Sequence, residues 1–518
     1  MLYKFKKKPK LSSLNGIKVN IPPGQISSPM FSKNGLLKQD HYTLFGKIYY
    51  FRKENFLDDI ALIEYHKQYF DVLRYENIEE FNKQAERLMD KWIDLNGKVG
   101  SGLQPYVTSL RLVNWIKYFL INKNKKKKYH ISAAQQFEVL SCNIEYHLLG
   151  NHILANYKAL IICRLFFDEK FLPKIKFEKL LNLFLNELDR QVTRGGAHFE
   201  LSLSYQSIII EDILDIVNFM IAYDRVQRVP ELLHFVNKLL DHLKLLLHPD
   251  GKITFFNDSN FSNASAFTNL LAYYEKLKER FFEKKIIITD SGIHKISIEN
   301  SSLYVNFSNV LASYIPGHTH AEALSFELSL NNKRVFVNSG VSEYGTSKLR
   351  LYQRGTSAHN CLTINNKNSS EIWHGFRLGK RARVDNFQYR ILPNGAFLKA
   401  SHNGFEKFPE KVNYSREFQL IERSLSITDI IEVKKKISVQ RHLHLHPLVD
   451  TEIIKHNRIK LFCTLSKEII GFIDTDKTSI EIYNGTWNPE FYNSKNNKNI
   501  ILKNSVSYPS KLKFRIYW

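Results

Sequence analysis

Two histidines stand two residues apart just before a predicted strand. His318 and His320 follow Pro316-Gly317, and apolar residues alternate with polar ones over 323–330, the period of a half-buried strand. Next-but-one residues of an extended chain point the same way, so both imidazoles can face one pocket. Loops held by a sheet often carry functional residues, but the same spacing also fits two surface histidines.

A metal ion would suit three side chains of this region. Asn338 ends the returning strand of the predicted hairpin, and His359 lies ahead of a further predicted strand. Together with His320 they would offer two imidazoles and an amide to one ion, structural rather than catalytic. An amide oxygen is a poorer zinc ligand than a carboxylate, so the pattern leaves the metal open.

Two further positions carry polar groups at predicted helix starts. Gly150 is placed to end one helix and Asn151 to cap the next, with His152 beside it. An amide at a helix start could equally donate to an anion. Tyr205 lies at the start of a predicted amphipathic helix. Its side chain could serve a functional site, or its ring could pack against the apolar residues that follow.

The elements that must position these residues change character along the chain. Residues 1–50 predict a basic arm and an irregular lead-in. Helical spacing of apolar residues, joined by short loops, then predicts an all-helical domain over 51–284, and a period of two predicts an antiparallel β-sandwich over 285–518. The predicted helices are 57–70, 78–94, 105–122, 133–149, 151–168, 173–193, 203–222, 230–248 and 263–281, and the first strands are 286–288, 293–298, 303–307, 323–330, 334–338 and 360–364.

The amino-acid composition narrows the classes of molecule that this protein could bind. The 518 residues include 74 Lys and Arg against 51 Asp and Glu, a formal net charge of +23 that favours a polyanionic partner. No nucleic-acid-binding module is recognisable, and no apolar run is long enough to span a membrane. The basic segment at 1–10 is not followed by a signal-peptide core. The four cysteines make no C-x-x-C pair, and Cys163 and Cys361 are expected to be buried free thiols.

Six segments together resemble one enzyme family, the heparinase II/III-like polysaccharide lyases, which share their architecture with certain alginate lyases. The resemblance covers roughly residues 80 to 450. The segments are S-L-R-L-V-N-W-I from Ser109, E-Y-H-L-L-G-N-H-I-L-A-N-Y-K-A-L from Glu145, G-G-A-H-F-E-L-S-L-S-Y-Q-S from Gly195, G-H-T-H-A-E-A-L-S-F-E-L from Gly317, Y-Q-R-G-T-S-A-H-N-C-L-T-I from Tyr352 and W-H-G-F-R-L-G-K-R-A from Trp373.

The resemblance implies a helical (α/α) toroid followed by a β-sandwich, and β-elimination on a uronic-acid polysaccharide. It implies that Asn151 neutralises the uronate carboxylate, with His152 adjacent, that Tyr205 is the catalytic base and acid, and that His318 assists. His320, Asn338 and His359 match positions that hold zinc in some members, where this chain has Asn338 in place of a carboxylate. No cofactor is needed for the chemistry. Arg354 is the candidate contact for an anionic substrate, with a salt bridge at a strand edge as the alternative.

A catalytically weak or inactive acidic-polysaccharide-binding protein is the alternative function. A glycoside hydrolase is disfavoured, because hydrolysis needs two placed carboxylates that this set of residues does not supply. The expected partner is an anionic polysaccharide, with no nucleic acid and no transmembrane segment. The family resemblance implies the bacterial cell envelope or periplasm, and the missing signal peptide implies the cytoplasm.

Overall fold

The chain forms two compact units. A computed structural model describes residues 17–27, 36–38, 41–45, 47–50, 61–74, 79–96, 101–262, 264–278, 290–476 and 478–518. The first unit comprises Met1–Val192, Ser207–Leu240 and Thr268–Ile286, and the second comprises Thr193–Gln206, Asp241–Phe267 and Ile287–Trp518. Two stretches of the helical half, 193–206 and 241–267, therefore belong to the unit that contains the large sheets. The predicted boundary near residue 284 lies outside the described residues.

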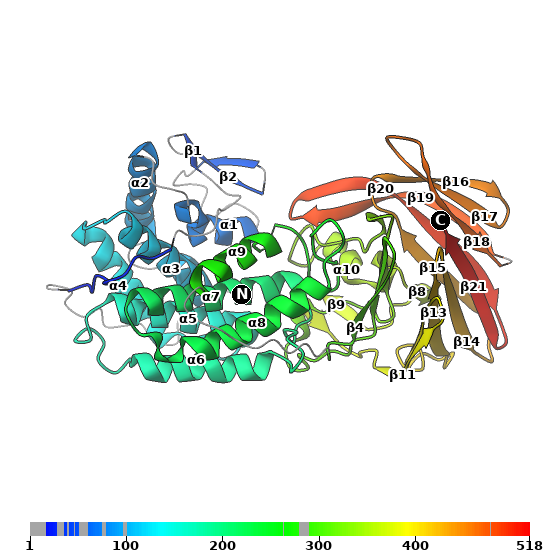
Figure 1. Ribbon diagram of the computed structural model, residues 1–518, viewed down its shortest axis with the longest axis horizontal. Helices are drawn as coiled ribbons and strands as arrows, with labels where there is room; N and C mark the ends of the chain where they lie inside the picture. Colours follow the sequence, from blue (N-terminus) through cyan, green and yellow to red (C-terminus); the bar gives the residue numbers. More distant parts are fainter. Residues whose placement is uncertain are drawn as a thin grey trace. The chain divides into compact units, whose positions relative to one another are not determined.

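Helices dominate the first half of the chain, as predicted (Figure 1). Among the described residues, no helix is long and apolar enough to cross a membrane. The helix α7 has the predicted bounds, and most others begin or end within four residues of the prediction. The α-helices are α1 (Ala61–Tyr69), α2 (Glu79–Asn96), α3 (Pro105–Ile121), α4 (Lys127–Cys142), α5 (Gly150–Phe166), α6 (Phe177–Gln191), α7 (Leu203–Ala222), α8 (Val229–Leu245), α9 (Phe267–Lys278) and, among the strands, α10 (Lys348–Arg354).

The junction before α5 differs from the prediction. The helix α4 begins at Lys127, inside the lysine run, and ends at Cys142, so Gly150 does not end a helix. Gly150 is instead the first residue of α5, after Leu149 at a φ of 54°. Asn151 is therefore the second helical residue rather than the cap.

Strands occupy the second half, and three short ones precede the helices. β1 to β3 form an antiparallel sheet in a region predicted to be irregular. The strands are β1 (Leu36–Lys38), β2 (His41–Leu44), β3 (Lys47–Tyr50), β4 (Ile293–Ile298), β5 (Ser301–Asn306), β6 (Phe326–Leu330), β7 (Lys333–Phe336), β8 (Leu362–Ile364), β9 (Ile372–His374), β10 (Arg377–Leu378), β11 (Val384–Leu392), β12 (Gly395–His402), β13 (Asn413–Ile421), β14 (Ser424–Glu432), β15 (Ile437–His444), β16 (Val449–Lys455), β17 (Arg458–Cys463), β18 (Ile469–Thr475), β19 (Ser479–Glu490), β20 (Asn493–Val506) and β21 (Ser510–Tyr517).

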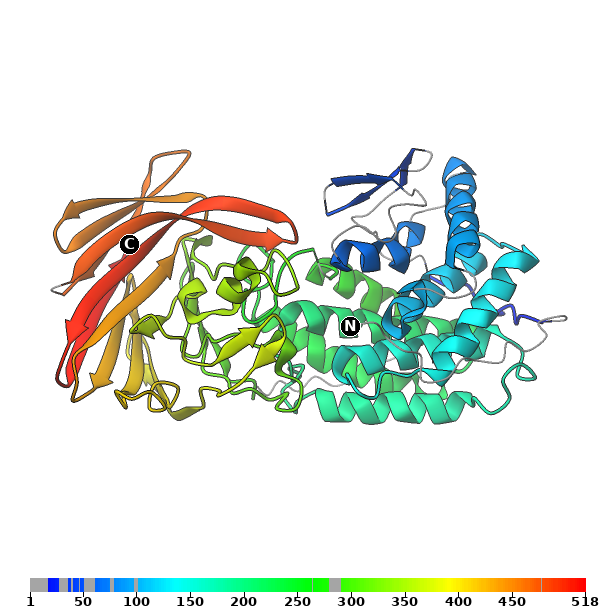
Figure 2. The ribbon, with the colours of Figure 1, turned by 180° about the vertical axis from the view of Figure 1, so that it is seen from behind.

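Three larger antiparallel sheets share one apolar core in the second unit. Their strand orders are β11-β12-β13-β14-β21-β18-β17-β16, β19-β20-β15-β8 and β4-β5-β6-β7. Leu303, Phe326, Leu362, Ile427 and Phe514 come from all three sheets and are almost fully buried in this core. In both views the orange and red strands of the last hundred residues lie in curved sheets (Figures 1 and 2).

The strand β6 is buried on both faces rather than one. It begins at Phe326, three residues later than predicted, because Leu324 has a φ of 64° that breaks the extended chain. Its polar face is covered as well: Glu327 is 0% exposed and accepts hydrogen bonds from His248 and from the backbone N–H of Asn338. The prediction of a half-buried strand is wrong because alternating polarity cannot distinguish water from a buried polar partner.

Paired charges lie inside the helical unit. Lys158 of α5 contacts Asp212 of α7 at 2.5 Å, and Lys117 of α3 contacts Asp215 of α7 at 2.5 Å. All four side chains are at most 4% exposed, so each charge depends on its partner. These pairs hold α5 and α3 against α7.

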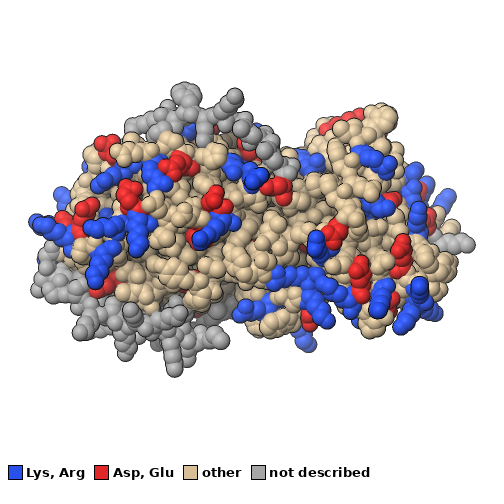
Figure 3. Space-filling model, turned by 90° about the horizontal axis from the view of Figure 1, so that it is seen from below, with Lys and Arg blue, Asp and Glu red and all other residues tan. Residues whose placement is uncertain are grey.

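On the face drawn in Figure 3, Lys and Arg predominate over Asp and Glu, in keeping with the net charge.

Neutral buried histidines make the stability of the protein sensitive to acid. Burial lowers the pKa of His198, His320, His402 and His444 to about 3, so each is uncharged at neutral pH. In the unfolded chain an imidazole binds a proton below about pH 6.5. The folded state therefore loses stability as the pH falls from 6.5 toward 3, by up to about 1.4 kcal/mol per histidine per pH unit.

Glu327 has the opposite effect on the stability of the folded state in acid. Burial raises its pKa from 4.5 to about 7, so this single carboxyl stabilises the fold as the pH falls from 7 toward 4.5. Because four histidines outweigh one carboxyl, we expect the Tm, measured by circular dichroism, to fall steadily between pH 6.5 and 4.5. A Tm that stayed constant or rose over this window would contradict the expectation.

Candidate active site

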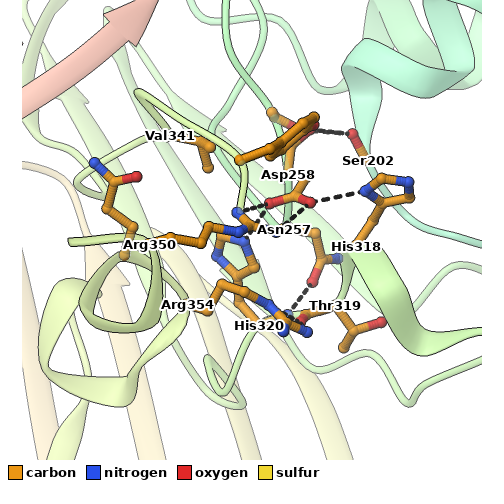
Figure 4. A network of polar contacts seen from close by, with 12 residues as sticks. Ser202, Asn257, Asp258, His318, Thr319, His320, Val341, Arg350 and Arg354 are labelled. Atoms are coloured by element: carbon orange, nitrogen blue, oxygen red, sulfur yellow. Dashed lines mark hydrogen bonds and ion pairs between the residues drawn. The ribbon is translucent and has the colours of Figure 1, made fainter. Parts of the chain in front are cut away.

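A buried carboxylate organises the polar centre of the second unit. Asp258 lies in the loop between α8 and α9, and its backbone carbonyl accepts a hydrogen bond from Ser202 Oγ at 2.7 Å. His318 Nδ1 and His320 Nε2 each approach the carboxylate of Asp258 at 2.7 Å, and Arg350 contacts it at 2.5 and 2.7 Å (Figure 4). The prediction that both histidines face one place is confirmed, and that place is a carboxylate.

The charge state of this centre follows from its contacts. Burial alone would raise the pKa of Asp258, but the charge of Arg350 and the hydrogen bonds from the two histidines hold it well below its usual range. An ionised carboxylate only accepts hydrogen bonds, so the histidine nitrogens that face it must carry protons. In neutral His318 the proton is then on Nδ1, and Nε2 is left as an acceptor.

Tyr205 lies against His318. The two ring centroids are 4.0 Å apart, and the imidazole side chain is 15% exposed. The phenol oxygen of Tyr205 is 2.9 Å from that of Tyr344, so one hydroxyl donates to the other. Burial and the charge of Asp258 raise the pKa of Tyr344 well above its usual value, and the guanidinium of Arg350 lies 4.9 Å from its ring centre. Tyr344 therefore stays protonated and neutral beside Tyr205, and either hydroxyl can be the donor in this pair.

His320 and His359 form a second contact behind this centre. Nδ1 of His320 is 3.2 Å from Nε2 of His359, and Nδ1 of His359 is 3.0 Å from a carboxylate oxygen of Glu322 without the alignment of a hydrogen bond. Two facing imidazole nitrogens, each backed by a carboxylate, would fit two ligands of a metal ion.

The third predicted ligand does not complete the set. The oxygen of Asn338 accepts a hydrogen bond from the backbone N–H of Asn360 at 3.3 Å, and its amide nitrogen is buried without a partner. Within the part of the chain that the structure describes, no three His, Cys, Asp or Glu side chains are placed to hold a metal. The predicted trio of His320, Asn338 and His359 does not fit zinc as it stands.

Arg354 has a different role from the predicted one. It ends α10 rather than lying at a strand edge, and it is 0% exposed. Its guanidinium donates to the carbonyls of Thr319 at 2.6 Å and His374 at 2.7 Å. With its donors directed at backbone oxygens, Arg354 braces the loop that carries His318 and His320, and we assign it this role in place of a contact with substrate or a salt bridge.

A second polar group lies in the first unit, at the start of α5. The amide of Asn151 donates to the hydroxyl of Tyr106 at 3.4 Å, and the ring of Tyr106 lies 4.5 Å from that of His152. Nδ1 of His152 is 3.3 Å from a carboxylate oxygen of Glu145, and the imidazole side chain is 32% exposed. Asn151 itself is 5% exposed. An amide, a phenol and an imidazole thus occupy adjacent positions.

Sequence reasoning missed Asp258, Arg350 and Tyr344. Asp258 lies in N-D-S-N after two phenylalanines, and Arg350 and Tyr344 lie in a polar stretch with no period. Asp258 is 60 positions from His318 and 92 positions from Arg350 in the sequence, so no local pattern joins them. The available indication was a carboxylate among the amide and hydroxyl side chains of N-D-S-N, in a loop that also carries Asp250 and Lys252.

Comparisons with known proteins agree with this architecture. Residues 36–287 match the Heparinase II/III N-terminus family model, and residues 287–518 match the Heparinase II/III-like, C-terminal model. A curated heparin-sulfate lyase of Bacteroides stercoris is 23% identical over 390 residues, which cover 67% of this chain and 56% of that protein. The chain thus spans little more than half the length of that relative.

Solved structures show the same fold. A crystal structure of heparinase III has a TM-score of 0.67 at 15% identity, covering 92% of this chain and 79% of that one. A heparan sulfate lyase from Pedobacter heparinus has a TM-score of 0.57 at 16% identity, with coverage of 92% and 79%. Since the two family models together span residues 36 to 518, the chain belongs to the heparinase II/III-like family.

Proposed function

We propose that this protein is a polysaccharide lyase that cleaves a uronic-acid-containing acidic polysaccharide by β-elimination. The substrate class is heparan-sulfate-like or another cell-surface polysaccharide, and the reaction needs no cofactor. The observation that carries the proposal is the position of Tyr205, whose phenol contacts a neutral phenol on one side and whose ring lies on an imidazole on the other. We also propose that the helices of 51–284 close into a toroid and that the strands of 285–518 pack as a sandwich.

The chemistry requires a group that first takes and then gives a proton. The phenolate of Tyr205 removes the proton α to the uronate carboxylate, an enolate-like state forms, and the phenol then protonates the leaving glycosidic oxygen. The C4–O bond breaks, and a C4–C5 double bond forms. When Tyr205 is a phenolate at the start of this cycle, the hydroxyl of Tyr344 donates the hydrogen bond that joins the two side chains.

The uronate carboxylate must be neutralised while charge builds on it. We assign this to the amide of Asn151, a neutral donor, with the imidazole of His152 beside it. His318 is held by the Asp258 carboxylate with Nε2 as its acceptor atom, and it orients the phenol against which it lies. The proposed mechanism uses only side chains of this protein.

Ultraviolet absorbance tests the proposal directly. The purified protein is incubated with heparan sulfate, heparin, alginate and hyaluronan, and absorbance is followed over time. Elimination leaves a double bond conjugated to a carboxylate, which absorbs in the ultraviolet, whereas hydrolysis leaves none. We expect absorbance to rise with at least one substrate. Salt-sensitive binding without any absorbance change would instead identify a binding protein, and cleavage without absorbance would identify a hydrolase.

A further inference from the structure

A basic hairpin lies beside the candidate active site. We use this name for residues 371–383, in which β9 and β10 pair antiparallel. Its backbone is held by the two arginines of α10: Arg354 donates to the carbonyl of His374 at 2.7 Å, and Arg350 donates to that of Gly375 at 3.1 Å. The same arginines contact the Asp258 and His318 loops, so the hairpin and the site share one support.

The turn of the basic hairpin contacts the site itself. The ring of Phe376 lies 5.2 Å from that of Tyr344 and 6.0 Å from that of His318. Gly375 lies so close to the carbonyl of Gly345 that an added Cβ would be 1.5 Å from it, and only glycine fits there. The hairpin is thus seated on the segment that carries Tyr344.

The outer groups of the hairpin are an aromatic ring and cations. Trp373 is 60% exposed, although a ring of this size is usually buried at least in part. Arg377 and Lys380 are exposed, and neither side chain makes an ion pair or hydrogen bond with any described residue. Within the described ranges, Arg383 forms an ion pair with Asp385, at 3.2 Å on the surface.

We propose that the basic hairpin is a subsite that binds the anionic sugar unit next to the one cleaved. The indole of Trp373 stacks on a sugar ring, and Arg377 and Lys380 pair with its carboxylate or sulfate groups. Trp373 is three residues from Phe376, so it lies within about 11 Å of the residue that contacts His318. This inference rests on the proposed function, because adjacency to the elimination site is what favours a saccharide over single-stranded nucleic acid, which also binds aromatic and basic groups.

Binding in a background that cannot turn substrate over tests the subsite. In the Tyr205→Phe protein, affinities for octasaccharides of heparan sulfate, alginate and hyaluronan are measured by calorimetry, with and without Trp373→Ala or the double change Arg377→Gln and Lys380→Gln. We expect Trp373→Ala to weaken binding about five- to ten-fold. The double change should weaken it about three- to ten-fold and lower the slope of log affinity against log salt by about two.

Matched variants elsewhere in the second unit control for loss of a ring or of charge. Tyr508 is 70% exposed, and Lys434 and Lys435 are exposed beside each other. Tyr508→Ala and the double change Lys434→Gln and Lys435→Gln should leave the affinities unchanged. In the otherwise wild-type enzyme, the hairpin changes should raise KM on long chains with little effect on kcat.

Three results would overturn the subsite. The first is wild-type-like affinity of the hairpin variants, and the second is no octasaccharide binding at all by the Tyr205→Phe protein. The third is a loss of affinity in the hairpin variants that is confined to a single-stranded RNA probe, which would identify a nucleic-acid surface. Failure of the elimination proposal is a separate result: a protein that never raises ultraviolet absorbance but loses octasaccharide binding with Trp373→Ala keeps the subsite and loses the reaction.

Discussion

Replacing Tyr205 with phenylalanine should lower kcat for polysaccharide elimination by about three orders of magnitude, because in the proposed mechanism the change removes the group that takes and returns the proton. KM should change little, since the ring and its surroundings stay in place. The measurement is the initial rate of ultraviolet absorbance on whichever polysaccharide the wild-type protein cleaves. A variant that kept a tenth of the wild-type kcat would show that Tyr205 is not the base.

The Tyr205→Phe variant should remain folded. Phenylalanine keeps the ring contact with His318, whose centroid lies 4.0 Å away. The change removes one hydrogen bond and leaves the buried hydroxyl of Tyr344 without this partner, at a cost of about 1–3 kcal/mol. A loss of activity with an unchanged circular dichroism spectrum therefore reports on chemistry rather than on folding.

Tyr344→Phe is the matched control, because it breaks the same hydrogen bond from the other side. It leaves the proposed base Tyr205 in place and removes only the hydroxyl that would donate to its phenolate form. We expect kcat to fall between about ten-fold and a hundred-fold, the size of one hydrogen bond to a charged group. If Tyr344→Phe were as inactive as Tyr205→Phe, the two phenols would act as one unit and the assignment of the base to Tyr205 alone would be wrong.

Local periodicity predicted the helices and strands well, because burial on one face leaves a repeating pattern in the sequence. The helix of Tyr205 has the predicted bounds, 203–222, and the strand at 293–298 does as well. The pattern failed where polar residues are buried against polar partners. The prediction of a half-buried strand at 323–330 missed Glu327, which a histidine 79 residues away covers.

The candidate site was only partly predictable for the same physical reason. His318 and His320 were identified because their spacing is local. Asp258 was not, since its partners lie 60 to 92 residues away and are brought together only by the fold. The family resemblance supplied the expected roles of Asn151 and Tyr205, which stay predictions. It supplied nothing about the carboxylate that holds the histidines.

Replacing Asp258 with asparagine should destabilise the protein by about 3–5 kcal/mol, because the change leaves the charge of Arg350 buried and unpaired. Both side chains are 0% exposed, so water cannot replace the lost partner. The free energy of unfolding is measured with denaturant at pH 7. Asp474→Asn is the matched control, since Asp474 pairs with Arg458 on the surface, where the two side chains are 34% and 39% exposed, and we expect it to cost no more than about 1 kcal/mol.

The pH dependence of this difference has a definite sign. The pKa of Asp258 is lowered in the folded state, so its contribution is present above the unfolded value of about 3.9 and is lost as the pH falls through the folded value. The gap in stability between wild type and Asp258→Asn should therefore be constant from pH 5 to 8 and narrow only below about pH 4. A gap that closed near pH 6 would mean that the histidines, rather than the carboxylate, set it.

Removing both charges separates stability from catalysis. Asp258→Asn combined with Arg350→Met leaves no unpaired buried charge, so much of the lost stability should return. Activity should not return with it, because the carboxylate that fixes the proton of His318 on Nδ1 is still missing. A double variant that regained both would mean that Asp258 serves only to neutralise Arg350. Regained stability with a low kcat and an altered pH profile would instead identify Asp258 as the residue that positions His318 for the reaction.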